Sequence, residues 1–297
     1  MSDTAAIVVT YNRKKLLREC IRNLQMQTQK VDIVIIDNMS TDGTAEMLKP
    51  FIKNDSIIYH STGKNIGGAG GFHEGIKFAY KLGYEYFWLM DDDCIPTINA
   101  LKQLKLADKE LNGKYGFICS KVLWTDNHIC RMNIPKLSLS KKVSDFNTPI
   151  VPIRMGTFVS FLTKRSVVEK VGLPVKEFFI WGDDLEYSQR ISLNYPCYLI
   201  NKSIVIHKTK NNEGSNIAID DAERISRYQL AYRNEMFLYR EIGLKGYIYQ
   251  FIRLNLHAFR VVFKSKDHRF LRLKTIILGT KSGIKFHPQI RKVKDEL

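Results

Sequence analysis

Residues Glu85-Tyr-Phe-Trp-Leu-Met-Asp91-Asp92-Asp93 lead from an apolar run directly into three consecutive carboxylates. The apolar part predicts a buried strand, and the aspartates then lie at its carboxyl end. Such close like charges repel one another, and a bound cation relieves that repulsion. Oxygen ligands suit Mg²⁺ or Mn²⁺, and open α/β sheets bind ligands outside the carboxyl ends of their strands. The stretch therefore predicts a site for a metal ion and a phosphate-bearing ligand, with a solvated acidic turn as the simpler alternative.

The rest of the chain alternates strands and helices before it becomes mostly helical. Further strands are expected at residues 5–10, 31–36, 56–60, 154–162, 197–200 and 203–206, and helices at 13–27, 72–82, from 184 to about 193, and after about 220. This order predicts an α/β fold with a Rossmann-like, mainly parallel central sheet flanked by helices, followed by a helical C-terminal extension.

The net charge of +16 over 297 residues is concentrated near the end of the chain. Residues 240–297 hold 14 Lys and Arg against 4 Asp and Glu. A basic segment of this kind indicates a polyanionic partner, either nucleic acid or an anionic membrane surface. We find no recognised nucleic-acid-binding motif, which favours the membrane.

Cysteine usage and hydropathy indicate a cytoplasmic protein. The five cysteines show no CxxC spacing, which argues against a disulfide framework or a zinc site. We expect no signal peptide and, because no run of 18 apolar residues occurs, no membrane-spanning helix.

A glycine-rich string, Gly63-Lys-Asn65-Ile-Gly67-Gly68-Ala-Gly70-Gly71-Phe72, precedes the expected helix at 72–82. Glycines allow close approach of the backbone to a ligand, and helix N-termini favour anions. A dinucleotide site would place its glycines after the first strand, which here leads into Thr10-Tyr-Asn-Arg13 instead. The string predicts an anion-binding loop other than a classical NAD site, with a flexible surface loop as the alternative.

A pair of carboxylates in Trp181-Gly-Asp183-Asp184 stands at the start of an expected helix. The tight, partly apolar surroundings would raise a carboxylate pKa toward that of a useful general base. The alternative is a helix cap with charges that favour the helix dipole.

His207 ends the β-branched run Ser-Ile-Val-Ile-His. A lone histidine in this position is more often structural than a metal ligand. The spacing by itself leaves both readings open.

Residues 245–264 form an amphipathic pattern that is basic and aromatic. The polar positions are Gln250, Arg253, His257, Arg260 and Lys264, with Tyr, Phe, Ile and Val opposite them. This pattern is typical of a helix in a membrane interface. A helix packed on the catalytic domain with a charged outer face is the alternative.

Five strings of the sequence, in the order in which they occur, resemble those of glycosyltransferase family 2, whose members are inverting enzymes of the GT-A fold. They are Val8-Val-Thr-Tyr-Asn-Arg13, Ile36-Asp37-Asn-Met-Ser-Thr-Asp-Gly43, Asn65-Ile-Gly-Gly-Ala-Gly-Gly-Phe72, Met90-Asp-Asp-Asp93 and Trp181-Gly-Asp-Asp184. The resemblance covers roughly residues 5–210. The glycine string followed by the triple aspartate is most similar to the bacterial galactofuranosyltransferase and rhamnosyltransferase branch, which builds surface polysaccharides.

The resemblance implies a role for each matching residue. The donor nucleotide and sugar would be bound by Thr10, Arg13, Asp37, Asn65, Gly67, Gly68, Gly70, Gly71, Asp91, Asp92 and Trp181. Mn²⁺ or Mg²⁺ would be held by Asp91, Asp93 and His207. Asp184 matches the catalytic base, with Asp183 as the alternative.

The resemblance also implies a domain plan and partners. Residues 1–215 would form the GT-A catalytic domain, with the nucleotide-sugar half at 1–95 and the acceptor half at 96–215. Residues 216–297 would be a helical extension that holds the enzyme on the inner face of the cell membrane. The expected donor is UDP-galactofuranose, with dTDP-rhamnose second. The expected acceptor is a lipid-linked saccharide or glycan, and a homo-oligomer is possible.

Two other classes of protein could account for some of the same sequence features. A metal-dependent nucleotidyltransferase also carries aspartates at a sheet edge, but it needs a basic phosphate-clamping loop that residues 10–15 only loosely provide. A basic nucleic-acid-binding protein would explain the net charge but not the acidic motifs.

Overall fold

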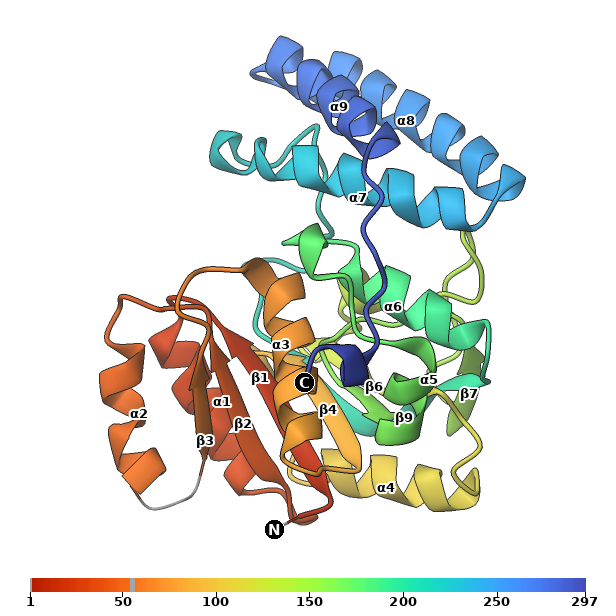
Figure 1. Ribbon diagram of the computed structural model, residues 1–297. Coiled ribbons are helices and arrows are strands. Elements are labelled where there is room, and N and C mark those ends of the chain that lie inside the picture. The colour runs from red at the N-terminus through yellow and green to blue at the C-terminus, as the bar shows by residue number, and fades with distance from the viewer. Residues whose placement is uncertain (1, 54–56) are drawn as a thin grey trace.

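The computed structural model describes residues 2–53 and 57–297 and has the expected α/β architecture (Figure 1). Within these residues nine strands form one sheet in the order β3-β2-β1-β4-β8-β6-β9-β5, with β7 also paired to β9. The strands are β1 Thr4–Thr10, β2 Asp32–Asp37, β3 Ile58–Ser61, β4 Tyr86–Asp91, β5 Cys94–Pro96, β6 Phe117–Trp124, β7 Ile150–Ile153, β8 Phe161–Lys164 and β9 Cys197–His207.

Helices lie between the strands along much of the chain, and the last three follow β9. The helices are α1 Lys14–Gln25, α2 Thr44–Lys53, α3 Gly67–Lys81, α4 Ala100–Glu110, α5 Arg165–Val171, α6 Asp183–Ser192, α7 Arg227–Glu241, α8 Leu244–Lys264 and α9 Arg269–Ile284. Short 3-10 turns lie at Arg131–Asn133, Lys176–Phe178, Ala222–Arg224 and Val293–Asp295.

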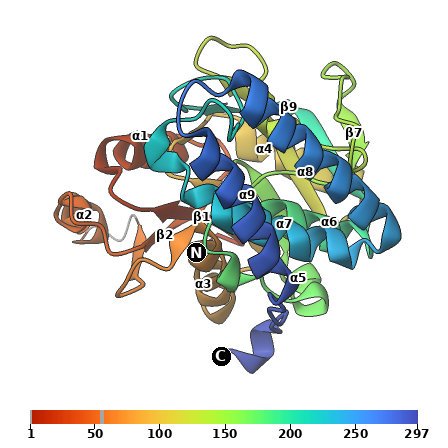
Figure 2. The ribbon, with the colours of Figure 1, turned by 90° about the horizontal axis from the view of Figure 1, so that it is seen from above.

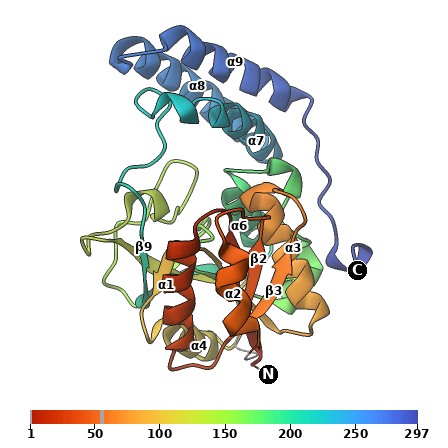
Figure 3. The same cartoon turned by 90° about the vertical axis from the view of Figure 1, so that its left-hand side faces the viewer.

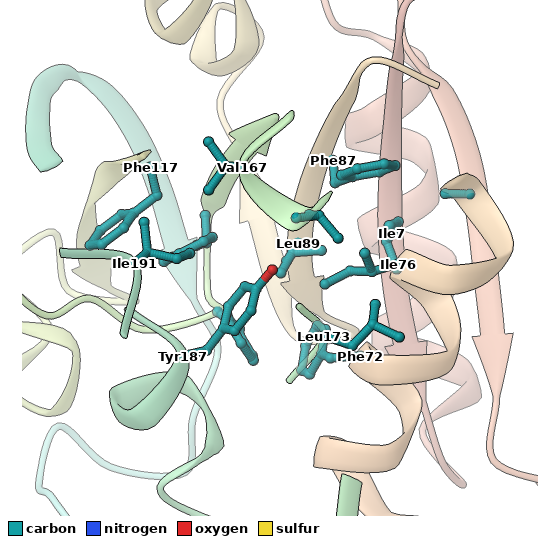
Figure 4. Close-up of a cluster of buried hydrophobic side chains, with 14 of the residues drawn as sticks. Ile7, Phe72, Ile76, Phe87, Leu89, Phe117, Val167, Leu173, Tyr187 and Ile191 are labelled. Atoms are coloured by element: carbon teal, nitrogen blue, oxygen red, sulfur yellow. The ribbon is translucent and has the colours of Figure 1, made fainter. Parts of the chain in front are cut away.

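The sheet divides the catalytic part into three layers. Alternate residues of one strand face opposite layers, so Ile7 of β1 packs with α3 while Val8 packs with α1. Figure 4 shows side chains of α3, β4 and α6 meeting on one face, among them Phe72, Leu89 and Tyr187. This packing fixes α6 against the strand that ends in the aspartates.

The sheet is mainly parallel, as predicted, but it also contains antiparallel pairs. Strands β3, β2, β1 and β4 are mutually parallel, whereas β8 is antiparallel to both β4 and β6. Strands β5 and β7 are antiparallel to β9, whereas β6 and β9 are parallel to each other. The βαβ rhythm that predicts parallel pairing stops after β4, and the antiparallel pairs begin there.

Two expected strand assignments in the second half were wrong. Most of the strand expected at 154–162 is instead a connection, because residues 154–160 lead from the end of β7, beside β9, to the start of β8, beside β4. The two strands expected at 197–206 are one strand, with a register shift where Ile200 pairs with Ser120 and Ile204 with Lys121. The expected strand at 56–60 begins at Ile58, and Ser56 lies outside the described residues.

The helices α7, α8 and α9 form a layer above the end of the sheet at which β1 and β4 finish (Figures 1 and 3). Seen from above, α8 and α9 lie across the catalytic part (Figure 2). The chain then returns to the catalytic part, where Val293 is fully buried and Glu296 contacts His73 at 3.2 Å. Among the described residues, no helix combines the length and hydropathy required to cross a bilayer.

Candidate active site

The acidic triplet lies at the carboxyl end of β4, where residues of the first loop hold it. Thr10, the last residue of β1, donates a hydrogen bond from Oγ1 to Oδ2 of Asp92 at 2.7 Å. The Arg13 guanidinium lies 2.5 Å from Oδ2 of Asp93 and 3.4 Å from Oδ1 of Asp92. Half of the Arg13 side chain is exposed. Its remaining N–H groups are therefore available to an anion that approaches this edge.

Four potential metal ligands converge beside the triplet. They are the carboxylates of Asp91 and Asp93, the thiol of Cys94 and the imidazole of His207, and their ligand atoms lie within 4.8 Å of one another. His207 reaches the triplet because β9 pairs with β5, which places it opposite Cys94. Its Nε2 lies 3.1 Å from Oδ1 of Asp93. Two carboxylates are ligands that Mg²⁺ and Mn²⁺ prefer, and the imidazole adds a nitrogen donor, so these residues fit the predicted cation.

Burial makes the charges of this cluster costly. Burial and the charge of Asp93 raise the pKa of Asp91 to about 7, and burial raises the pKa of Asp92 to about 6 although Arg13 opposes it. Burial disfavours a charged His207, yet the hydrogen bond to Asp93 prevails and raises the His207 pKa to about 10. Because a cation favours ionised carboxylates and a neutral imidazole, metal binding here should release protons.

The second carboxylate pair, Asp183 and Asp184, begins α6 after Gly182, which has φ 87°. Burial raises the pKa of Asp184 to about 6, while the Leu185 amide at 2.7 Å and the Lys136 ammonium favour its ionised form. Burial and the charge of Asp184 raise the pKa of Asp183 well above its ordinary value. These contacts favour the ionised form of Asp184, and the choice between Asp184 and Asp183 as the base stays a prediction.

The two acidic groups share one electrostatic environment. The charge of Asp91 contributes to the raised pKa of Asp183, although the two residues come from different elements. We call Asp91, Asp93 and His207 the metal-type cluster. The fold thus places this cluster at the same edge of the sheet as the carboxylate pair that begins α6.

The glycine string forms the start of α3, which corrects the expectation of a loop before a helix that begins at Phe72. Gly67 begins α3 with φ 75°, and a Cβ there would lie 2.1 Å from the Phe179 carbonyl oxygen. A Cβ at Gly70 or Gly71 would lie 2.9 or 2.5 Å from a neighbouring side chain. These glycines allow tight packing of α3. Among the described residues, no heavy atom apart from the chain neighbours and the nearby backbone of α3 itself lies within 4 Å of the Cβ position of Gly68. The predicted contacts of all four with the donor stay predictions.

The crowded surroundings of Gly67 and the open surroundings of Gly68 predict different effects of an alanine on stability at these two positions. Gly67→Ala should lower the free energy of unfolding by about 2–4 kcal/mol, because the new methyl group meets a carbonyl and φ is left-handed. Gly68→Ala should leave it unchanged or raise it by up to about 1 kcal/mol. Urea unfolding followed by circular dichroism measures both, and equal effects at the two positions would contradict the packing role of Gly67.

Three other predicted donor-binding residues have partners within the protein. The buried Asp37 carboxylate accepts hydrogen bonds from the hydroxyls of Ser40 at 2.7 Å and Tyr59 at 2.9 Å. Asn65 is exposed, and its Oδ1 accepts a hydrogen bond from the first amide of α3 at 2.9 Å. The Trp181 ring packs against α7. A role in donor binding stays a prediction for each.

Sequence reasoning missed several neighbours of these groups. Asn133 Oδ1 lies 2.8 Å from Nδ1 of His207, and the Cys130 thiol lies 3.9 Å from the same nitrogen. The charge of Lys136 favours the ionised form of Asp184. All three come from an irregular segment without a motif, so no sequence signal indicates their position.

Comparison with known proteins identifies the family of this site. The family model described as Glycosyl transferase family 2 matches residues 5–172. The chain belongs to glycosyltransferase family 2. The resemblance inferred from the motifs is thereby confirmed, and the chain is a transferase of this family.

The similar curated proteins include two galactofuranosyltransferases. GlfT1 of Mycolicibacterium smegmatis is 24% identical over 203 residues, which cover 63% of this chain and 64% of that protein. GlfT1 of Mycobacterium tuberculosis H37Rv is 27% identical over 198 residues, covering 63% of each. The alignments therefore span slightly less than two thirds of these relatives.

Solved structures agree on the fold. The structure of GalNAc-T7 with UDP, GalNAc and Mn²⁺ covers 78% of this chain and 46% of that chain, with a TM-score of 0.59 and 16% identity. At this identity the similarity establishes the GT-A fold alone.

Proposed function

We propose that this chain is a metal-dependent, inverting galactofuranosyltransferase that uses UDP-galactofuranose. The observation that carries the proposal is the metal-type cluster of Asp91, Asp93 and His207 at the same sheet edge as Asp184. The similarity to two GlfT1 proteins favours galactofuranose over other sugars.

The residues of the site suit a single displacement. When bound at Asp91, Asp93 and His207, Mn²⁺ or Mg²⁺ would offset negative charge on the departing nucleotide diphosphate. Asp184 accepts the proton of an acceptor hydroxyl, and the hydroxyl oxygen forms a bond to the anomeric carbon. The bond from that carbon to the diphosphate oxygen breaks on the opposite face, so the configuration inverts. Arg13 adds positive charge beside the diphosphate.

A ligand panel tests this proposal. We would measure the melting temperature with UDP, dTDP, GDP and NAD⁺, each with and without Mn²⁺, because a ligand of the folded state raises it by mass action. Metal-dependent stabilisation by UDP, followed by galactofuranose transfer, is the expected result. Stabilisation by dTDP instead would indicate the rhamnose donor. Stabilisation by NAD⁺ alone, or by none of them, would refute the nucleotide-sugar assignment.

We further propose that the acceptor is a lipid-linked saccharide and that α8 and α9 hold the enzyme on the inner face of the cell membrane. In support, α8 is oriented opposite to the usual surface helix. Much of its polar side faces α7: Gln250 is 2% exposed, Arg253 pairs with Glu235, and His257 accepts or donates at 2.8 Å to a tyrosine of α7. This orientation leaves the apolar side of α8 exposed, which argues against the alternative in which that side packs on the catalytic domain and only charged side chains face outward.

The outer side of these helices is aromatic and basic. Phe251, Phe263 and Phe270 are 67–80% exposed. Exposed lysines and arginines lie on the same helices, at Lys245, Arg260, Lys264, Lys274 and Lys281. Large apolar side chains bordered by cations suit the interface of an anionic bilayer.

Membrane binding should depend on these aromatic residues. The triple variant Phe251→Ser, Phe263→Ser, Phe270→Ser should bind vesicles containing anionic phospholipid at least about tenfold more weakly than the wild type. Flotation with anionic and with neutral vesicles measures this, and Leu193→Ser, an exposed leucine at the end of α6, is the matched control. A wild type that binds neither vesicle, or that forms a dimer which buries these side chains, would refute the membrane assignment.

A further inference from the structure

The loop that leads into α6 has an unusual backbone. Phe179 has φ 63° and ψ −57°, and Trp181 has φ 66°, although neither residue is glycine. The amide of Ile180 donates to the Phe178 carbonyl at 2.7 Å, which closes a three-residue turn around Phe179. Such conformations are strained and persist only where the surrounding structure holds them.

The side chain that holds this loop is Asn234, a fully buried residue of α7. Its Nδ2 lies 3.0, 3.0 and 2.8 Å from the carbonyl oxygens of Phe178, Ile180 and Trp181. Its Oδ1 accepts hydrogen bonds from the Arg233 guanidinium at 2.9 and 3.0 Å. The arginine therefore fixes which end of the amide faces the loop.

The contacts continue on both sides of the asparagine. Arg233 also donates to the carbonyls of Glu177 and Phe178 at 2.7 and 3.1 Å. From the opposite side, the Ala69 amide of α3 donates to the Phe179 carbonyl at 3.1 Å. The loop is thus held between the glycine-rich start of α3 and the first helix of the C-terminal layer.

We propose that Asn234 is a positioning residue that fixes the backbone of residues 178–181 and thereby the direction in which Asp183 and Asp184 leave the start of α6. The inference rests on the proposed function, in which Asp184 accepts the acceptor proton. It also makes α7 a part of the active-site scaffold, although α7 lies beyond the residues 5–172 that match the family.

The test uses the full chain with Asn234→Ala and Asn234→Asp. Gln229→Ala, an exposed amide of the same helix, is the control. Asn234→Asp keeps the shape of the side chain. It places a carboxylate oxygen, which cannot donate a hydrogen bond, against the three carbonyl oxygens of the loop. Both Asn234 variants should lower kcat by about tenfold to a hundredfold, while the Kd for UDP with Mn²⁺ stays within about twofold, since a small misplacement of a reacting group affects the chemical step most. Amide hydrogen exchange at residues 178–186 should become at least about tenfold faster.

Unchanged kcat and unchanged exchange in both variants would overturn the proposal. A parallel loss of kcat, UDP affinity and melting temperature would also overturn it, because that result indicates a general structural role. If Asn234→Ala does not fold, Arg233→Lys tests the same contacts through the same measurements. If the wild type transfers no sugar at all, the proposed function fails, whereas the exchange measurement still tests whether Asn234 holds the loop.

Discussion

Replacing Asp184 by asparagine should lower kcat by about 10³-fold, within the range that a general base contributes. The amide keeps the size of the side chain and its place beside the Leu185 amide, but it cannot accept a proton. The affinity for UDP with Mn²⁺ should change little, because the metal-type cluster lies at the end of β4, in the turn that follows it and on β9, and not on α6. Steady-state kinetics and isothermal titration of the same preparation measure both quantities.

Asp183→Asn is the matched control for this prediction. Burial and the neighbouring charge raise the pKa of Asp183 and favour its neutral form, so an amide at this position should lower kcat less than Asp184→Asn does. The wild-type rate should also fall as the pH drops below about 6, where Asp184 takes up a proton. A larger loss in Asp183→Asn than in Asp184→Asn would transfer the role of base to Asp183.

The second large effect is expected for Asp93→Ala, which should abolish both activity and the metal-dependent part of UDP binding. Asp93 contacts Arg13 and His207, so its removal takes away a proposed metal ligand and the carboxylate that orients His207. For wild type at 100 times Kd, mass action contributes about 2.7 kcal/mol, or roughly 5 °C in melting temperature. In the variant, UDP should give the same small shift with and without Mn²⁺.

An exposed aspartate provides the control for that experiment. Asp221→Ala removes an equal charge far from the cluster in the sequence and should retain the full metal-dependent shift. Retention of that shift in Asp93→Ala would show that Asp93 is not needed to bind the metal. The site would then have to be sought elsewhere in the protein.

The C-terminal layer connects the two proposals of membrane binding and loop positioning. Its outer helices, α8 and α9, present aromatic side chains to the solvent. Its inner helix, α7, contacts the loop at residues 178–181 that leads to Asp183 and Asp184. The division of the chain at residue 215 stays a prediction. The buried Val293 and the contact of Glu296 with His73 nevertheless tie the end of the chain to the catalytic part.

Sequence alone determined the fold class, the acidic triplet and the family, because these depend on local patterns. An apolar run that ends in aspartates places those aspartates at a sheet edge whatever follows, and periodicity identifies β1, α1, β2 and β4 to within two residues. The Trp181-Gly-Asp-Asp184 string likewise marked the start of α6.

Only the tertiary structure decided what surrounds these groups. The pairing of β9 with β5 brings His207 to Asp93 across 114 positions in the chain, and no local pattern encodes such a pairing. The packing of α7 on the loop at 177–182 likewise gives Asn234 three backbone partners that its neighbours in sequence do not predict. The roles of glycines and of the faces of α8 were decided by close packing for the same reason: burial depends on the neighbours that the fold supplies, which periodicity alone does not specify.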